Sequence, residues 1–525
     1  MSRELRYRRF VEIIASSGVA AILDEALPGG GRPRQLGAEA VLLSVMAALD
    51  SGRPAQLAAA HDASRDLSAS EQVRLGICRS GREGVATYRQ LSDTFSLLCS
   101  SVDPSPVPSF RGVAEPDRRG HLDAVRRAVP NERLVHLEQL VDDLVEASIP
   151  DAYRSASSSL AVDWTDHETW SRPRRREDPQ PANDPDASFG HAKRNAPGAK
   201  DYLFFGYYAG VATMVNDEGG PVVPELIRRA FLHAPRVDPA AQMASRLRTL
   251  GESGVIVGDV LADCGYSSRE PVGFARPVRR AGGRLVMDLH PQDRGQKGTF
   301  EGALLVNGGC YCPATPGPLL SLGPLPRAAS SEDKERHARS CRQLDEYRFA
   351  PLTRSDEDGY VRMLCPAVAG KLRCPLRPDS MTASLERTTV LRVPEGIPER
   401  CCVQKTISIP PQVNEKTRQA YPYPSEAHAV SYARRTAAER AFASLADPSR
   451  GGVRRGWSRL FGLAKNSVMY ALMVVVRNVR ITESFERRRA EEERRRSGAV
   501  RSRERPRRYG RPERDPGEPD PADTG

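Results

Sequence analysis

The stretch Ser159–Asp166 contains an aspartate that a strand would hold in a fixed direction. Leu160, Val162 and Trp164 alternate with smaller or polar residues, which is the period of a half-buried strand. Such a strand places Asp163 on the face opposite these three side chains. Because a carboxylate on a sheet is costly without compensation, and a metal ion often supplies it, Asp163 is a candidate metal ligand. For this stretch alone, an aspartate that caps a loop is the competing interpretation.

A second aspartate directly follows another predicted strand. The segment Gly254–Ala262 is mostly apolar, as expected of a strand covered on both faces. Asp263 comes next, and Gly265 behind it permits a tight turn. Carboxylates at the ends of neighbouring strands can converge on one metal. Asp259 is the rival ligand but lies further inside the strand, and capping of the next helix is the alternative role for Asp263.

A third polar group lies in a helix predicted from about Ser425 to Asp447. Tyr432, Arg435 and Glu439 follow one another at offsets of three and four, so a single helix would place them on one face. A surface ion pair between Arg435 and Glu439 would explain two of the three without any chemistry.

Together these segments resemble the catalytic set of DDE transposases of bacterial insertion sequences. The similar subgroup has a strand-rich insertion before the glutamate and a tyrosine–arginine–glutamate–lysine signature around it. The resemblance covers roughly residues 155–480. It implies that Asp163, Asp263 and Glu439 are the catalytic residues and the ligands of Mg²⁺ or Mn²⁺, and that Tyr432 and Arg435 contact DNA. One departure is Ala446, which stands where the signature has its lysine.

The same resemblance implies a function. It is metal-dependent cleavage and strand transfer of an insertion sequence, a transposition and DNA recombination reaction on double-stranded element ends and target. A homo-oligomer on the DNA and a nucleoid-associated place in the cytoplasm are implied as well. Two alternatives stay open, a catalytically silent DNA-binding relative, favoured by Ala446, and a metal-dependent nuclease that cuts without joining.

The elements that must position these residues predict an α/β protein. Residues 155–290 have the order strand, strand, strand, helix, strand, helix, strand, which is that of a ribonuclease-H-like core. The predicted parts are a helical, possibly DNA-binding domain (1–100), a linker with helices (101–154), the first part of the core (155–290), an inserted irregular or β subdomain (291–420), helices that complete the core (421–482) and a disordered charged tail (483–525).

Several elements can be placed more closely. The pattern predicts a helix from about Thr87, and Gly84–Arg89 could open a DNA-recognition helix or an ordinary packing helix. The other expected elements are strands over Asp201–Val215, Pro221–Phe231 and Arg284–Leu289, helices over Asp238–Leu250, Pro271–Ala281 and Trp457–Arg477, and a polar loop over Arg172–Gly198.

Seven of the ten cysteines fall in residues 291–420, namely Cys310, Cys312, Cys341, Cys365, Cys374, Cys401 and Cys402. In a cytoplasmic protein this favours zinc over disulfides, although the spacings are not the usual ones for zinc ligands. A structural Zn²⁺ and unligated buried thiols are the two open interpretations.

Charge and histidines complete the expectations. The net charge is +11; residues 486–514 contribute +7 and residues 515–525 contribute −4, so +8 belongs to the rest and favours nucleic-acid partners. No apolar run approaches the ~20 residues of a membrane span, and no signal peptide is evident, so we expect a cytoplasmic protein without membrane contact. His167, His191 and His290 are expected to be structural; Lys193, Arg194 and Lys200 could contact phosphate or form a solvated loop.

Overall fold

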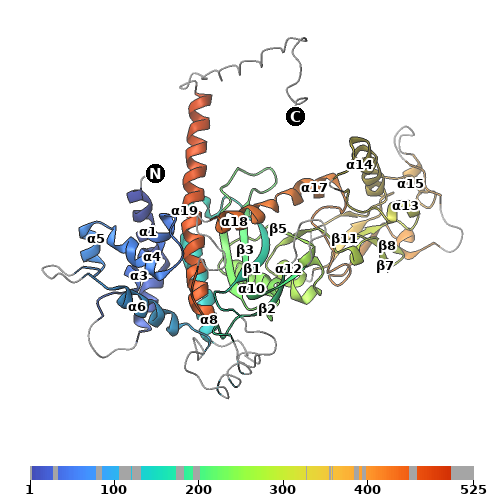
Figure 1. Cartoon of the computed structure of the whole chain (residues 1–525). Helices are drawn as coiled ribbons and strands as arrows, with labels where there is room; N and C mark the ends of the chain where they lie inside the picture. The colour runs from blue at the N-terminus through green and yellow to red at the C-terminus, as the bar shows by residue number, and fades with distance from the viewer. Residues whose placement is uncertain are drawn as a thin grey trace, which may run out of the picture. The chain divides into compact units, whose positions relative to one another are not determined.

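The computed structural model describes the chain over fifteen stretches. They are residues 3–27, 34–78, 85–105, 117, 120, 124, 132–172, 182–192, 201–326, 328–353, 356, 359–382, 389–392, 398–447 and 458–497. Contacts divide the chain into two units, Met1–Ile481 and Thr482–Gly525. The fold is mixed α/β, so the α/β class predicted from the sequence is confirmed (Figure 1).

Helices form the N-terminal third of the larger unit. They are α1 (Arg3–Ser17), α2 (Val19–Glu25), α3 (Ala38–Asp50), α4 (Leu57–Arg65), α5 (Ala69–Arg74), α6 (Tyr88–Ser101), α8 (Glu132–Ala147) and α9 (Asp151–Arg154). The predicted start near Thr87 is confirmed, because Thr87 is the N-cap of α6 and forms a capping box with Gln90. Gly84 lies outside the described residues, and recognition of DNA by this helix stays a prediction.

The central sheet has six strands, β1 (Ser159–Glu168), β2 (Ser188–Ala192), β3 (Tyr202–Val215), β4 (Ile227–His233), β5 (Asp259–Ala262) and β6 (Arg284–Met287). β1 is antiparallel to β3 and parallel to β5, and β5 is parallel to β6. The edge of β3 away from β1 pairs with β2 over its first residues and with β4 further along. β1 is therefore a central strand with neighbours on both sides.

The helices between the strands are α10 (Pro239–Glu252), α11 (Cys264–Ser267), the 3₁₀ turn η1 (Pro271–Gly273) and α12 (Ala275–Arg280). The expected helix over Asp238–Leu250 is confirmed as α10, whose N-cap Asp238 accepts a hydrogen bond from the Ala240 amide at 3.3 Å. The expected helix from Pro271 is divided into η1 and α12.

Three predicted strands are shorter in the structure, and one of them is β6, which ends at Met287 rather than at Leu289. The ladder of β4 begins at Ile227 rather than at Pro221, because prolines at 221 and 224 cannot donate to it. β5 covers only Asp259–Ala262, since its neighbours β1 and β6 begin opposite this segment. The polar-loop prediction for Arg172–Gly198 is wrong in part, because β2 lies inside it and Phe189 packs against Phe205 of β3, with ring centroids 5.3 Å apart.

The inserted subdomain (residues 291–420) contains two small antiparallel sheets, β7-β8-β9 and β10-β11-β12. Its elements are η2 (Pro291–Asp293), β7 (Gln296–Phe300), β8 (Ala303–Val306), β9 (Gly309–Tyr311), α13 (Gly317–Leu320), α14 (Ser331–Glu346), β10 (Ala350–Pro351), β11 (Val361–Leu364), α15 (Pro378–Met381), α16 (Arg400–Val403) and β12 (Thr406–Ile409). Its described residues bury a cluster of their own.

The chain returns to the sheet through α17 (Glu426–Ala433) and α18 (Thr436–Ala446), followed by α19 (Leu463–Arg496). α18 packs against β1 and β3 (Figure 1). The apolar first half of α19 shares one buried cluster with α18, the sheet, α8 and the N-terminal helices. Because the described residues of these elements share one core, they show no boundary at residues 100 and 154, and the domain boundaries expected there stay predictions.

Two predictions for the C-terminal helices need correction. The single helix expected over 425–447 is broken at Arg434 and Arg435. The tail expected to be disordered from residue 483 remains helical to Arg496, because Arg and Glu favour helix and pair along it, as Arg489 and Glu493 do at 3.2 Å. Within the part of the chain that the structure describes, no helix has the length and apolar character that crossing a membrane needs.

A buried histidine makes stability depend on pH. Burial lowers the pKa of His167 on β1 to about 4. Below pH 6.5 His167 binds a proton in the unfolded chain but not in the folded chain. The free energy of unfolding therefore falls as the pH drops towards 4, by up to about 3 kcal/mol. Urea midpoints at pH 7 and pH 5 should differ less in His167→Gln than in the wild type. His191→Gln, at an exposed position on β2, should leave the difference between the two midpoints unchanged. The same difference in all three proteins would contradict the role of His167 in this pH dependence.

Candidate active site

Asp163, in the middle of β1, lies on the strand that pairs in parallel with β5, and Asp263 directly follows the end of β5. β1 and β5 pair Leu160 with Val260 and Ala161 with Leu261, so the continued register places Asp163 opposite Asp263. Asp263 directly follows β5 and caps α11, where it accepts a hydrogen bond from the Gly265 amide at 2.9 Å. Asp263 therefore has the capping role, and its role as a metal ligand stays a prediction.

The environment of Asp163 is unusual for a carboxylate. Its side chain is only 18% exposed. The backbone amide of Trp164 donates a hydrogen bond to its carboxylate at 2.8 Å, and the Arg435 guanidinium donates another at 3.2 Å. Burial raises the pKa of the Asp163 carboxyl to about 7, and the nearby Asp263 and Glu439 also raise it, while Arg435 opposes them. The three predicted carboxylates therefore lie near one another, and Arg435 is the cation among them.

Arg435 connects the helical part of the site to the sheet. It lies at the break between α17 and α18 as the N-cap of α18, and its guanidinium pairs with Asp163 and with Glu439. The break consists of tight turns in which the Ala437 and Ala438 amides donate to carbonyls three residues earlier, at 3.1 and 3.0 Å. Glu439 is in the first turn of α18, and its side chain is 51% exposed.

Tyr432 belongs to α17 and not to the helix that carries Glu439, which corrects the prediction of one continuous face. Its ring stacks on His428 with centroids 5.7 Å apart and an interplanar angle of 14°. The Arg435 guanidinium lies 5.8 Å from the Tyr432 ring centroid. Arg435 thus contacts both Tyr432 and Asp163, and contact of Tyr432 or Arg435 with DNA stays a prediction.

Asp259, the rival ligand, is excluded by its own partners. It is 1% exposed and pairs with Arg284 at 2.6 Å and with Arg434 at 2.7 Å, and the Tyr421 hydroxyl donates to it at 3.1 Å. It begins β5, whereas Asp263 follows the end of that strand. Asp259 therefore fastens α17 and the end of the inserted subdomain to the sheet.

Tyr266 supports the site and was not singled out from the sequence. It is 1% exposed, and its ring meets Trp164 with centroids 4.4 Å apart, beside Phe274 at 4.6 Å. Gly265 directly precedes Tyr266 and does not have a positive φ. A Cβ at this position would lie 3.0 Å from the Trp164 ring. The glycine is needed for this close approach rather than for a turn. The aromatic contact fixes the middle of β1 against α11.

The donor set suits a hard divalent cation in type, because it consists of carboxylate oxygens. The arrangement is not closed, however. Across the described residues, no three His, Cys, Asp or Glu side chains form a group that could hold a metal ion. Arg435 supplies the positive charge between Asp163 and Glu439 instead.

Other residues considered from the sequence have separate places. His167 is buried, His191 is exposed, and His290 accepts a hydrogen bond from the Gln292 amide at 3.3 Å, so His167 and His290 fit the expected structural role. Ala446 is the last residue of α18. Lys193, Arg194 and Lys200 lie outside the described residues.

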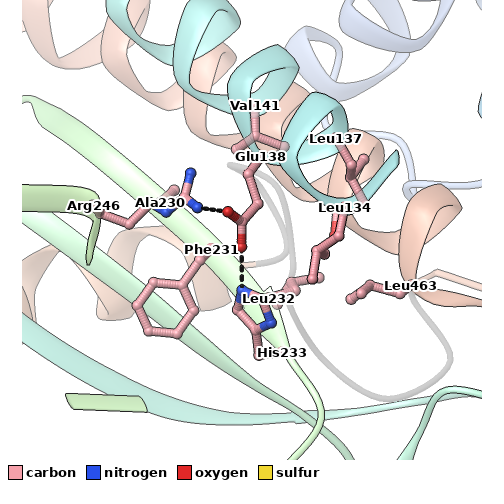
Figure 2. A pocket seen from close by; sticks show the side chains of 11 residues that line it. Leu134, Leu137, Glu138, Val141, Ala230, Phe231, Leu232, His233, Arg246 and Leu463 are labelled. Carbon is pink, nitrogen blue, oxygen red and sulfur yellow. Dashed lines mark hydrogen bonds and ion pairs between the residues drawn. The ribbon is translucent and has the colours of Figure 1, made fainter. Parts of the chain in front are cut away.

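A small cavity between α8 and β4 is a poor candidate for a site. Its volume is about 10 Å³, which is room for about one water molecule. Glu138 points into it and pairs with Arg246 and with His233, the latter at 3.1 Å (Figure 2). This buried network joins α8 to the sheet and to α10, and we consider it structural.

No known protein-family model and no curated protein matches this chain. The function of the chain is therefore inferred from the segments that carry Asp163, Asp263 and Glu439 and from the contacts of these residues.

Proposed function

We propose that this protein is a DDE-type DNA transposase that cleaves and joins DNA with the help of divalent metal ions. The observation that carries the proposal is the strand register that places Asp163 opposite Asp263, together with Arg435, which pairs with both Asp163 and Glu439. Asp163, Asp263 and Glu439 are separated by 100 and then 176 positions in the sequence, and they are the carboxylates that the resemblance implies.

The strand order supports the same proposal. Without β2, the sheet has the order β4-β3-β1-β5-β6, with β1 antiparallel to β3 and parallel to β5 and β6. This is the order of a ribonuclease-H-like core, with Asp163 on its first and central strand. The inserted subdomain falls between Asp263 and Glu439, as the resemblance requires.

The chemistry follows from the charge of the site. Asp163, Asp263 and Glu439 would hold Mg²⁺ or Mn²⁺, and the ions would supply activation of water or of a 3′-hydroxyl and stabilisation of the leaving oxygen. Asp163 needs a neutralising partner because burial opposes its charge. Arg435 meets this need in the absence of substrate, and its planar guanidinium is also suited to a DNA phosphate.

A catalytically silent DNA-binding relative is the second candidate, and Ala446 is the observation that favours it. The signature's lysine is missing there, and Arg450, Arg454 and Arg455, which could replace its charge, lie outside the described residues. The ion pairs of Arg435 with Asp163 and Glu439 also describe a stable metal-free arrangement.

A joining assay separates these functions. Duplexes carrying the DNA that flanks the coding sequence, both intact and pre-cleaved to a 3′-hydroxyl, are incubated with the full chain and a target plasmid. We expect joined products with Mg²⁺ or Mn²⁺ and none with a chelator. Metal-dependent cutting without joining would indicate the nuclease, and binding without either reaction would indicate the silent relative.

A further inference from the structure

Arg434, the neighbour of Arg435 in the break between α17 and α18, is held by three parts of the fold. Its guanidinium donates to the Asp259 carboxylate at 2.7 Å and to the backbone carbonyl of Asn216, also at 2.7 Å. It donates as well to the carbonyl of Ser431, in the last turn of α17, at 3.1 Å. Only 17% of the Arg434 side chain is exposed. One side chain therefore joins β5, the residue that follows β3 and the end of α17.

Asp259 is a rigid anchor for this arginine. Its side chain is 1% exposed, and its backbone amide donates to the Ser159 hydroxyl at 3.3 Å, which ties the first residue of β5 to the first residue of β1. Arg284 of β6 and the Tyr421 hydroxyl pair with the same carboxylate. Because breaking a buried, paired carboxylate away from its partners is costly, Arg434 has a fixed partner on the sheet.

The two adjacent arginines contact the sheet at two different levels. The continued register of β1 and β5 places Asp259 opposite Ser159, which is four residues before Asp163. At about 3.3 Å per residue, the carboxylates that pair with Arg434 and Arg435 are about 13 Å apart along the strands. Side chains alternate along a strand and paired residues share a face, so both carboxylates lie on one face of the sheet. The backbone between the two guanidiniums is thus fixed at two points of that face.

The backbone of the break needs contacts of this kind. The amides of Arg434 and Arg435 donate to carbonyls three residues earlier, at 3.2 and 2.9 Å, instead of continuing the regular pattern of an α-helix. Residues 425–447 contain no internal glycine or proline that would impose such a break. Tertiary contacts must therefore impose it, and the direction in which the chain leaves the break places Glu439, in the first turn of α18.

We propose that Asp259 and Arg434 are positioning residues for the candidate metal site. Their pair fixes the break against β5, and the break in turn directs Arg435 to Asp163 and places Glu439 at the start of α18. Asp259 begins β5, whereas the site lies beyond the other end of that strand, so Asp259 acts through the helix break and not by contact. This inference rests on the proposed function, because it assigns both residues to the site that the transposase reaction would use.

Hydrogen–deuterium exchange in the metal-free protein tests the positioning without any reaction. We expect the amides of residues 432–442 to exchange at least about tenfold faster in Arg434→Met and in Asp259→Asn, because hydrogen bonds to charged groups hold this segment closed. Arg276→Met is the matched control. Arg276 of α12 pairs with Glu415 at 2.6 Å, 139 residues further along the chain, and its loss should leave exchange at the break unchanged.

Metal binding and cleavage test whether the positioning serves the site. Mn²⁺ binding is measured from the electron paramagnetic resonance signal of the free ion, and cleavage is followed on end-labelled flanking DNA. Partners that orient metal ligands are worth about 10–100-fold, so Arg434→Met should weaken Mn²⁺ binding by about that factor and slow cleavage at saturating DNA. In a Glu439→Gln background the same substitution should add less than about twofold, since the ligand that it would displace is already lost.

The outcomes separate this inference from the proposed function. Wild-type exchange and Mn²⁺ binding in Arg434→Met would overturn the positioning role even if the wild-type protein joins DNA. Equal effects of Arg276→Met would also overturn it, because they would show a general loss of stability. A wild-type chain that neither binds Mn²⁺ nor cleaves DNA would overturn the proposed function. If Asp259→Asn does not fold, Arg434→Lys replaces it, and exchange between the wild-type and Arg434→Met rates is expected, since lysine keeps the charge without the second donor arm.

Discussion

Asp163→Asn is expected to abolish metal-dependent DNA cleavage and joining while the protein stays folded. Partners that merely orient metal ligands are worth about 10–100-fold, so loss of a ligand's charge should cost more than about 100-fold in rate. The asparagine side chain has the same size and can still accept a hydrogen bond from the Trp164 amide. Because burial raises the pKa of Asp163 to about 7, removing this charge should not destabilise the metal-free protein.

Asp166→Asn is the matched control for this experiment. Asp166 lies on the same strand but on its other face, where it accepts a hydrogen bond from the Tyr202 hydroxyl at 2.8 Å. Cleavage of end-labelled flanking DNA should be near wild type in this variant. If Asp163→Asn retains Mg²⁺-dependent cleavage, the proposed metal site is wrong. If both variants are inactive, the defect lies in β1 and not in the carboxylate.

The strands that carry the two aspartates could be predicted because their signals are local. Alternation around Val162 and the apolar segment before Asp263 need only the side chains of that segment to indicate a strand. The parallel pairing that brings them together followed from the order of elements. The lengths of β4 and β5 could not be predicted as well, because a ladder extends only as far as its neighbours do.

The break between α17 and α18 had no local signal. Residues 425–447 contain no internal glycine or proline and read as one helix. The break coincides with the pairing of Arg434 to Asp259, 175 residues away, and of Arg435 to Asp163, 272 residues away. Ion pairs over such separations cannot be inferred from helical spacing, yet they decide where Arg435 points. β2 was missed for a similar reason, because its five residues form a strand through their pairing with β3.

Sequence spacing could say little about the cysteines of the inserted subdomain. The separation of Cys365 and Cys374 is not the usual one for a pair of zinc ligands, which are two to four residues apart. In the structure all seven cysteines of this subdomain are free, and six of them are buried.

Arg246→Met is expected to cause the largest loss of stability of any substitution considered. Arg246 of α10 is 3% exposed and pairs with Glu138 of α8 (Figure 2). It also pairs with Asp142 of the same helix at 3.1 Å. Asp142 is also close to Arg229 at 3.6 Å. Removing one member of a buried ion-pair network leaves uncompensated charges, which costs about 3–5 kcal/mol. The midpoint of urea unfolding, followed by circular dichroism, should fall accordingly.

Arg248→Met on the same helix is the matched control for this loss. Arg248 lies two residues further along α10 and pairs with Glu252 at 2.6 Å, but both side chains are more than half exposed. Exposed pairs of this kind contribute about 0.3–0.5 kcal/mol, so the control should unfold almost as the wild type does. Adding Asp142→Asn to Arg246→Met should restore part of the lost stability, because it removes one of the stranded carboxylates. Equal effects of the two methionine substitutions would mean that the network between α8, β4 and α10 does not hold the helices to the sheet.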